Sequence, residues 1–309
     1  IGDKRSKETD HLILSSDRAD NGIEMSRTVT NGDYVYSRNF MPFLPQLRYI
    51  RYFEVSEIMQ NMRSDYAQDK LNALQRSLFT ERPVESLYHI KNDKWELNNL
   101  AEDETHREIL LEMRQQLRKE MISAKDVALL PEYELSLISK KSTPYQYRLT
   151  GNYAIEDIVD SAMLSGVKDE QSALQQVKLL KHENKFVRYW AAVGLRSQNK
   201  AVLSSLKAQL AKAMGDDYPP VAITVAATVY DIFDDKTAEN VLKQYCLDQN
   251  NDLALLTIHY LMYVDDKKPY IETVKSSRAM TGRNYPVKAA ALDFLASQGL
   301  LENSYSLRQ

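Results

Sequence analysis

The sequence has very little cysteine, little glycine and no long apolar run. One cysteine among 309 residues, Cys246, excludes an intramolecular disulfide framework and a cysteine-based zinc site. The segment from Val241 to Leu247 has helical spacing, which predicts a buried thiol rather than a nucleophile. No segment approaches the roughly 20 consecutive apolar residues that a bilayer crossing requires. We therefore expect no membrane partner.

An excess of either charge is also missing. The chain has 40 basic and 43 acidic residues and no Lys/Arg run that would neutralise a phosphate backbone, so we expect no nucleic-acid partner. Phosphate-binding loops and metalloprotease or serine-hydrolase motifs are absent from the sequence. The histidines have no metal-like spacing and are predicted to be structural or solvated: they are His11, His89, His106, His182 and His259. We expect no catalytic residue and no metal ligand within this chain.

The first part of the chain alternates apolar and polar residues with a period of two. Segments at 11–15, 23–30 and 33–40 are predicted strands, and Asn31-Gly32 between the last two predicts a tight hairpin turn. A two-residue turn would pair Thr30 with Asp33, Val29 with Tyr34, Arg27 with Tyr36 and Met25 with Arg38. On that face arginine planes could stack on aromatic rings, or the pairs could be ordinary cross-strand contacts.

The remainder of this part predicts a small α+β unit. A helical segment is expected at 54–79, a short strand at 86–90 and a charged amphipathic helix at 103–123. The apolar stripe of that last helix comprises Ile109, Leu110, Met113, Leu117 and Met121. Such a stripe covers one face of a small antiparallel sheet of about four strands. We expect this unit to span residues 1–145, with a linker at 142–146.

The second part, residues 146–309, is predicted to be entirely helical. Similar segments begin at 184, 218, 251 and 284, so the repeat is 34, 33 and 33 residues (218−184, 251−218, 284−251). That period, with one helix pair per unit, is typical of an α-solenoid. Equivalent positions should be buried: Val187, Val221, Ala254 and Val287, and likewise Leu195, Val229, Met262 and Leu295. The segments resemble HEAT-like repeats.

One loop carries the only candidate recognition residues. The polar segment 16–22 contains Asp17, Arg18 and Asp20, and Arg27 follows on the next predicted strand. A guanidinium suits sulfate, phosphate or carboxylate, and a neighbouring carboxylate suits sugar hydroxyls. We assign these four residues as tentative substrate-binding residues. The alternative is a network of Asp-Arg pairs that only stabilises the turn.

Two motifs resemble the C-terminal subdomain of type I sulfatases, in particular bacterial N-sulfoglucosamine sulfohydrolase-like members that carry HEAT-like helices behind it. The first runs from Ser16 through Arg27 to Asn39, and the second from Arg82 to Ala101. The resemblance as a whole covers about residues 8–125. The chain departs from the family pattern at Ser16, Ala19, Asn21, His89 and Lys94.

The resemblance implies a hydrolase of sulfate esters or sulfamates on sulfated glycans. Such enzymes use a formylglycine made from a Cys-x-Pro-Ser-Arg motif beside a bound calcium, and this chain contains no such motif; the segment 142–146 lacks the Ser-Arg. Calcium and formylglycine are therefore expected only in a missing N-terminal sulfatase catalytic domain, which would be the partner of this chain. The chain alone is predicted to be inactive, with Arg18 and Asp20 at the rim of a sugar-selecting pocket.

Two other interpretations remain open. The chain could be a non-catalytic α-solenoid module that binds a protein or a glycan, or a decayed gene product that folds without a function. The resemblance implies a periplasmic or secreted location. A homodimer through residues 11–40 is also plausible, because an incomplete sheet exposes an apolar patch.

Overall fold

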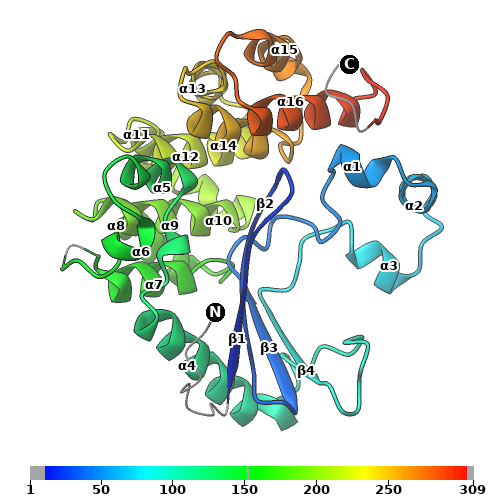
Figure 1. Ribbon diagram of the computed structural model, residues 1–309, viewed down its shortest axis with the longest axis vertical. Helices are drawn as coiled ribbons and strands as arrows, with labels where there is room; N and C mark the ends of the chain where they lie inside the picture. The colour runs from blue at the N-terminus through cyan, green and yellow to red at the C-terminus, as the bar shows by residue number, and fades with distance from the viewer. Residues whose placement is uncertain (1–10, 152, 305–309) are drawn as a thin grey trace.

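A computed structural model describes residues 11–151 and 153–304. A small antiparallel sheet with a covering helix comes first, and a long series of helices follows it (Figure 1). This arrangement confirms the predicted fold class. In the part of the chain that the structure describes, no helix is both long and apolar enough to cross a bilayer.

The sheet is a four-stranded meander in the order β1-β2-β3-β4. Its strands are β1 (Leu12–Ala19), β2 (Gly22–Thr30), β3 (Tyr34–Asn39) and β4 (Glu85–His89). Every neighbouring pair is antiparallel. The predicted strand at 86–90 is therefore confirmed with a shift of one residue.

The predicted register of the β2–β3 hairpin is wrong. Thr30 pairs with Val35 and Arg27 pairs with Arg38, so the connection is longer than the two-residue turn. The Asn31 side chain explains the difference, because its Oδ1 accepts hydrogen bonds from the backbone N–H groups of Asp33 (3.1 Å) and Tyr34 (2.8 Å) and so holds a wider loop. The register differs by two residues, and the predicted set of residues therefore stays on one face.

Helix α4 (Arg107–Ser123) covers this face of the sheet, as predicted. Its buried residues are Leu110, Met113, Leu117 and Met121. Ile109 is only partly buried and packs at the margin of the core. The short 3-10 helix η1 (Glu104–His106) precedes α4, and Asp103 caps it by accepting a hydrogen bond from the N–H of Thr105 (2.9 Å).

The helical segment predicted at 54–79 is not continuous, because three short helices lie in it and just before it. These are α1 (Arg51–Glu54), α2 (Glu57–Ala67) and α3 (Ala73–Ser77). Ser56 caps the N-terminus of α2, so α1 and α2 do not form one helix. Asn72 forms a capping box with Gln75 at the start of α3. Local capping thus breaks a stretch whose composition alone favours one helix.

Helices make up the rest of the chain. They are η2 (Val127–Leu129), α5 (Glu132–Ser139), α6 (Pro144–Tyr147), α7 (Ile155–Met163), α8 (Glu170–Leu179), α9 (Lys185–Arg196), α10 (Lys200–Ser204), α11 (Lys207–Ala213), α12 (Pro219–Phe233), α13 (Lys236–Cys246), α14 (Asn251–Leu261), η3 (Lys268–Tyr270), α15 (Ile271–Ala279) and α16 (Tyr285–Ser297). Helix α6 overlaps the predicted linker at 142–146; Thr143 caps it and Pro144 occupies its first turn.

The four repeated segments form α9, α12, α14 and α16, which pack against one another in that order (Figure 1). Each has a preceding partner helix in contact with it: α8, α11, α13 and α15. All eight equivalent positions predicted to be core are at most 6% exposed. The repeat therefore reflects helices that bury the same apolar positions against their neighbours.

The sheet and the helices share one apolar core. Arg38 on β3 donates hydrogen bonds to the carbonyls of Met163 (2.6 Å) and Ser165 (2.8 Å) after α7. The Trp190 indole on α9 donates to the Leu129 carbonyl (2.9 Å), and its ring lies 5.7 Å from that of Phe40. These contacts hold β3 and the residue after it against the helices.

Candidate binding site between the sheet and the helices

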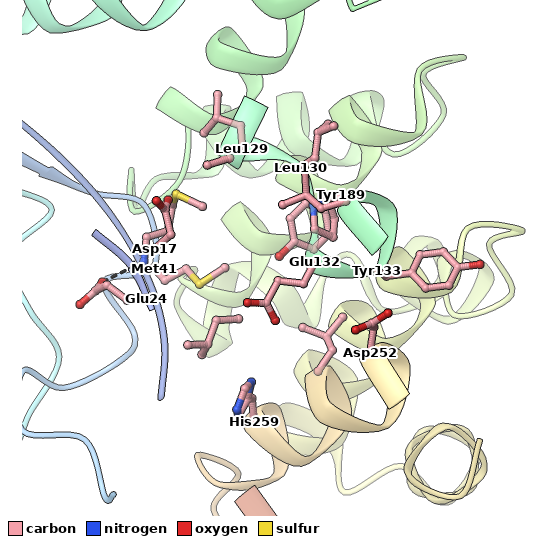
Figure 2. A pocket seen from close by; sticks show the side chains of 16 residues that line it. Asp17, Glu24, Met41, Leu129, Leu130, Glu132, Tyr133, Tyr189, Asp252 and His259 are labelled. Carbon is pink, nitrogen blue, oxygen red and sulfur yellow. Dashed lines mark hydrogen bonds between the residues drawn. The ribbon is translucent and has the colours of Figure 1, made fainter. Parts of the chain in front are cut away.

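Two hollows lie where strands β1 and β2 meet α5, α14 and α16. The outer groove has a volume of about 620 Å³ and is lined by Arg18, Asp20, Asn21, Glu132, Asp252 and Tyr285, among others. The inner cavity has a volume of about 100 Å³ and is lined by Asp17, Glu24, Tyr189, Asp252, His259 and several apolar residues (Figure 2). Glu132, Leu135 and Asp252 line both hollows, so the two are adjacent.

A bulge in the β1–β2 pair shapes the wall of the inner cavity. Ser16 pairs with Ser26 but Arg18 pairs with Ile23, so β2 contains one extra residue in this interval. As a result, the consecutive residues Glu24 and Met25 are both buried, although strict alternation would expose one of them. The turn itself needs Asp20 in the left-handed region, at φ +50°.

Arg18 lies in the outer groove, but its guanidinium is already engaged. Its Nε donates to Glu132 Oε1 (2.7 Å), a second nitrogen pairs with Glu132 Oε2, and a third interaction reaches the Asn21 carbonyl (3.1 Å). Arg18 therefore fixes the Glu132 carboxylate at the boundary of the two hollows. A sulfate group would have to compete with that bidentate pair.

Arg27 lines neither hollow. Its side chain is 2% exposed and binds Asp126 (2.6 Å) and Asp17 (2.7 Å). Burial lowers the pKa of Arg27, but the two carboxylates outweigh this effect and the net shift is upward. Arg27 thus stays charged and holds Asp17 from behind, while burial raises the pKa of Asp17 against the opposing charge of Arg27.

The four residues proposed from the sequence are therefore only partly brought together. Arg18 and Asp20 line the outer groove and Asp17 lines the inner cavity, whereas Arg27 supports Asp17. Whether any of them binds a substrate stays a prediction.

The sequence reasoning missed residues from the helical part, chiefly Glu132, Asp252 and His259. Asp252 and His259 are seven residues apart (259−252), so two turns of α14 bring them to one face. His259 is predicted from the sequence to be structural or solvated, and the structure places it inside α14, where it is 6% exposed. This face of α14 borders a cavity because β1 lies opposite it, and no local sequence pattern indicates that position.

His259 lines the inner cavity from α14 (Figure 2). Its Nε2 is buried and has no hydrogen-bond partner among the described residues. Burial holds the pKa of His259 well below its usual range, and the charge of Arg18 adds to this effect, while a backbone contact with Asn21 opposes it. The imidazole is therefore neutral at physiological pH.

A buried ion cluster lies behind the cavity. Glu24 on β2 accepts hydrogen bonds from Arg48 (2.6 Å) and from both terminal nitrogens of Arg82 (2.9 and 3.0 Å). Burial raises the pKa of Glu24, but the two arginines outweigh burial and the net shift is downward. This cluster ties the bulged strand to the segments at 41–48 and at 82 and so fixes the cavity wall.

The chemistry of a sulfatase centre does not fit the residues that the structure describes. Cys246 ends α13, is fully buried, and is followed by Leu247 and Asp248 rather than by a formylglycine motif. Burial raises the pKa of Cys246 to about 12. Within residues 11–151 and 153–304, no group of three or more His, Cys, Asp or Glu side chains is placed to hold a metal ion.

Comparison with known proteins links part of the chain to a sulfatase. An "Ulvan-active sulfatase" from Formosa agariphila is 32% identical to this chain over 136 residues, which is 44% of the chain. The match spans 23% of the length of that protein. No family model matches the chain.

This similarity supports a sulfatase-like relationship for nearly half of the chain. It agrees with the resemblance carried by the two motifs, which cover about residues 8–125. The shared part is less than a quarter of the relative, so the similarity concerns that part and not the activity or substrate of the whole relative.

Proposed function

We propose that this chain is the C-terminal portion of a sulfatase that acts on a sulfated glycan. The observation that carries the proposal is the 136-residue similarity to an ulvan-active sulfatase. It is supported by the groove at the β1–β2 turn, where Arg18 and Asp20 of the sulfatase-like motif lie. The formylglycine and the calcium would belong to a catalytic domain outside these 309 residues.

In this proposal the groove selects the substrate and does not perform the chemistry. Asp17, Arg18 and Asp20 would contact the glycan or position the residues that do, and Arg27 would hold Asp17 in place. Contacts remote from the reacting atoms change specificity more than they change the chemical step. Substitution of these residues should accordingly affect KM more than kcat.

We further propose that the chain consists of a sulfatase-like unit at 1–145 and HEAT-like repeats at 146–309. The stacked helices α9, α12, α14 and α16 with their partner helices support the second assignment. In this arrangement both units brace the β1–β2 turn: Arg18 pairs with Glu132 on α5 within 1–145, and Asn21 donates a hydrogen bond to Asp293 on α16 in the repeats.

The contact surface for the catalytic domain is proposed to include the edge strand β1. Its residues Leu12, Ile13 and Leu14 are 62%, 38% and 57% exposed, and among the described residues β1 has one strand neighbour, β2. Edge strands of this kind pair with further chain, so a second copy of this chain is the competing occupant. The sulfatase relationship favours a periplasmic or secreted setting.

Sulfate release is the direct test. The 309-residue chain and a longer protein that includes the preceding reading frame are assayed with ulvan and other sulfated glycans. We expect release only from the longer protein. In that protein Arg18→Ala should raise KM about tenfold with little change in kcat, because one lost charge-assisted contact costs on the order of 1.4 kcal/mol.

Arg107→Ala is the matched control. The side chain of Arg107, at the start of α4, is 65% exposed and pairs with the exposed Glu104 of η1, so KM should not change. A longer protein that binds the glycans without releasing sulfate would contradict the proposal and favour the non-catalytic binding module. Release by the 309-residue chain alone would contradict the assignment of the catalytic groups to another domain.

A further inference from the structure

The inner cavity combines hydrogen-bond acceptors with an apolar wall, and none of the described residues that line it is a lysine or an arginine. Of these residues, Asp17, Glu24, Glu132 and Asp252 are acidic. The arginines that neutralise three of these carboxylates, Arg27, Arg82 and Arg18, bind them from outside the lining. A bound sulfate or carboxylate would therefore meet carboxylate oxygens and no cation.

His259 supplies the observation that points to a ligand. Its Nε2 is buried at the cavity wall without a hydrogen-bond partner in the part of the chain that the structure describes, which is costly in a folded protein. A neutral imidazole donates through one nitrogen and accepts through the other, and a hydroxyl group can satisfy either. A ligand with several hydroxyl groups therefore pairs with Nε2 in either tautomer and donates to the carboxylates as well.

The remaining wall is apolar and the size is limited. Leu129, Leu130 and Leu256 line the cavity beside Ile23 and Met41. A volume of about 100 Å³ holds several water molecules or one edge of a sugar ring, because benzene alone occupies a cavity of about 150 Å³. The rest of a sugar ring would extend into the adjoining outer groove. A ring with C–H groups on one face and hydroxyls at its edge matches both kinds of wall.

We propose that the inner cavity receives one edge of a neutral monosaccharide unit, with Asp252 and His259 as its hydrogen-bonding residues. This inference rests on the proposed glycan function and adds to it that this subsite, built jointly by β1, β2, α5 and α14, recognises an uncharged ring. The charged part of a glycan would lie outside, in the outer groove, which shares Glu132 and Asp252 with the cavity.

Binding to the 309-residue chain tests the inference. The probes are methyl α-D-glucopyranoside, methyl α-L-fucopyranoside, methyl β-D-xylopyranoside and D-glucose 6-sulfate, titrated by saturation-transfer NMR. At least one neutral glycoside should bind with a Kd of about 1 mM, the value expected for a ligand of roughly 13 non-hydrogen atoms at ordinary ligand efficiency. D-glucose 6-sulfate should bind at least tenfold more weakly than the best neutral glycoside.

Two variants and one control separate recognition from folding. His259→Leu and Asp252→Asn should each weaken binding at least tenfold, while the thermal unfolding midpoint of Asp252→Asn stays near that of the unchanged chain. Glu272→Gln, on the exposed side of α15 and 82% exposed, should bind like the unchanged chain. Absence of binding by all three glycosides, equal binding of the sulfated sugar, or full binding by Asp252→Asn would overturn the inference.

These results are distinguishable from failure of the proposed function. Neutral-sugar binding together with a longer protein that releases no sulfate would reject the sulfatase and keep the sugar site. Sulfate release without sugar binding in the cavity would reject only the site.

Discussion

At the residue scale, Asp293 connects the candidate site to the last helix of the chain. Its Oδ1 accepts a hydrogen bond from the backbone N–H of Arg51 (3.0 Å), and its Oδ2 accepts one from Asn21 in the β1–β2 turn (3.3 Å). It is 3% exposed, and burial raises the pKa of Asp293 to about 6 in spite of these donors and the charge of Arg51. The charged form is thus disfavoured in the folded chain.

The sign of the pH dependence follows from this shift. Because the folded pKa lies above the unfolded value of 3.8, this residue stabilises the fold below pH 4 and loses that contribution as the pH rises through 6. Asp293→Asn should therefore match the unchanged chain at pH 4 and exceed its free energy of unfolding by up to about 3 kcal/mol at pH 8. Urea unfolding at both pH values measures the difference, and a pH-independent difference would contradict the prediction.

His259 shows what residue identity could and could not reveal. Its place in an apolar helical segment correctly indicated burial within α14. No sequence pattern predicts that Nε2 lacks a hydrogen-bond partner among the described residues, because that depends on which strand faces α14 across the cavity.

At the element scale, the loop between α7 and α8 depends on Gly166. Its φ is +84°, and an added Cβ would lie 2.5 and 2.9 Å from the two γ-carbons of Val84, just before β4. Val84 and Gly166 thus form a close contact between the segment before β4 and the helices. No neighbouring residue pattern predicts that approach from the sequence.

Gly166→Ala should destabilise the chain by roughly 2–5 kcal/mol, from a left-handed backbone cost of about 1–2 and an overpacking cost of about 1–3. Gly282→Ala is the matched control, because Gly282 has φ +88° but no heavy atom within 4 Å of the added Cβ. The control should lose only the backbone cost of about 1–2 kcal/mol. Equal losses in thermal or urea unfolding would show that Val84 simply moves aside.

The hairpin register also belongs to the element scale. The Asn31-Gly32 pair correctly indicated where the chain reverses, and the alternation correctly indicated the faces of β2 and β3. The number of loop residues was mispredicted because the Asn31 side chain bonds two backbone N–H groups, an alternative that the dipeptide does not distinguish.

At the scale of the whole molecule, one apolar core runs from the sheet through the last helix. We therefore expect a single cooperative unfolding transition. Trp190 is fully buried at the junction of sheet and helices, whereas Trp95 is 72% exposed, so a Trp95→Phe chain reports mainly on the junction. Its fluorescence and the far-UV circular dichroism should change at the same urea concentration; two separated transitions would support independent units divided near residue 145.

The sequence alone determined the periodic features of this protein. Alternation defined the strands, and the repeat of 33–34 residues placed α9, α12, α14 and α16 and the buried positions Val187 and Leu195, because such patterns are set by local backbone geometry. The tertiary structure alone decided that Asp17 and His259, 242 positions apart (259−17), line one cavity. Contacts between segments so far apart depend on how the sheet packs against the helix stack, and no local pattern encodes that packing.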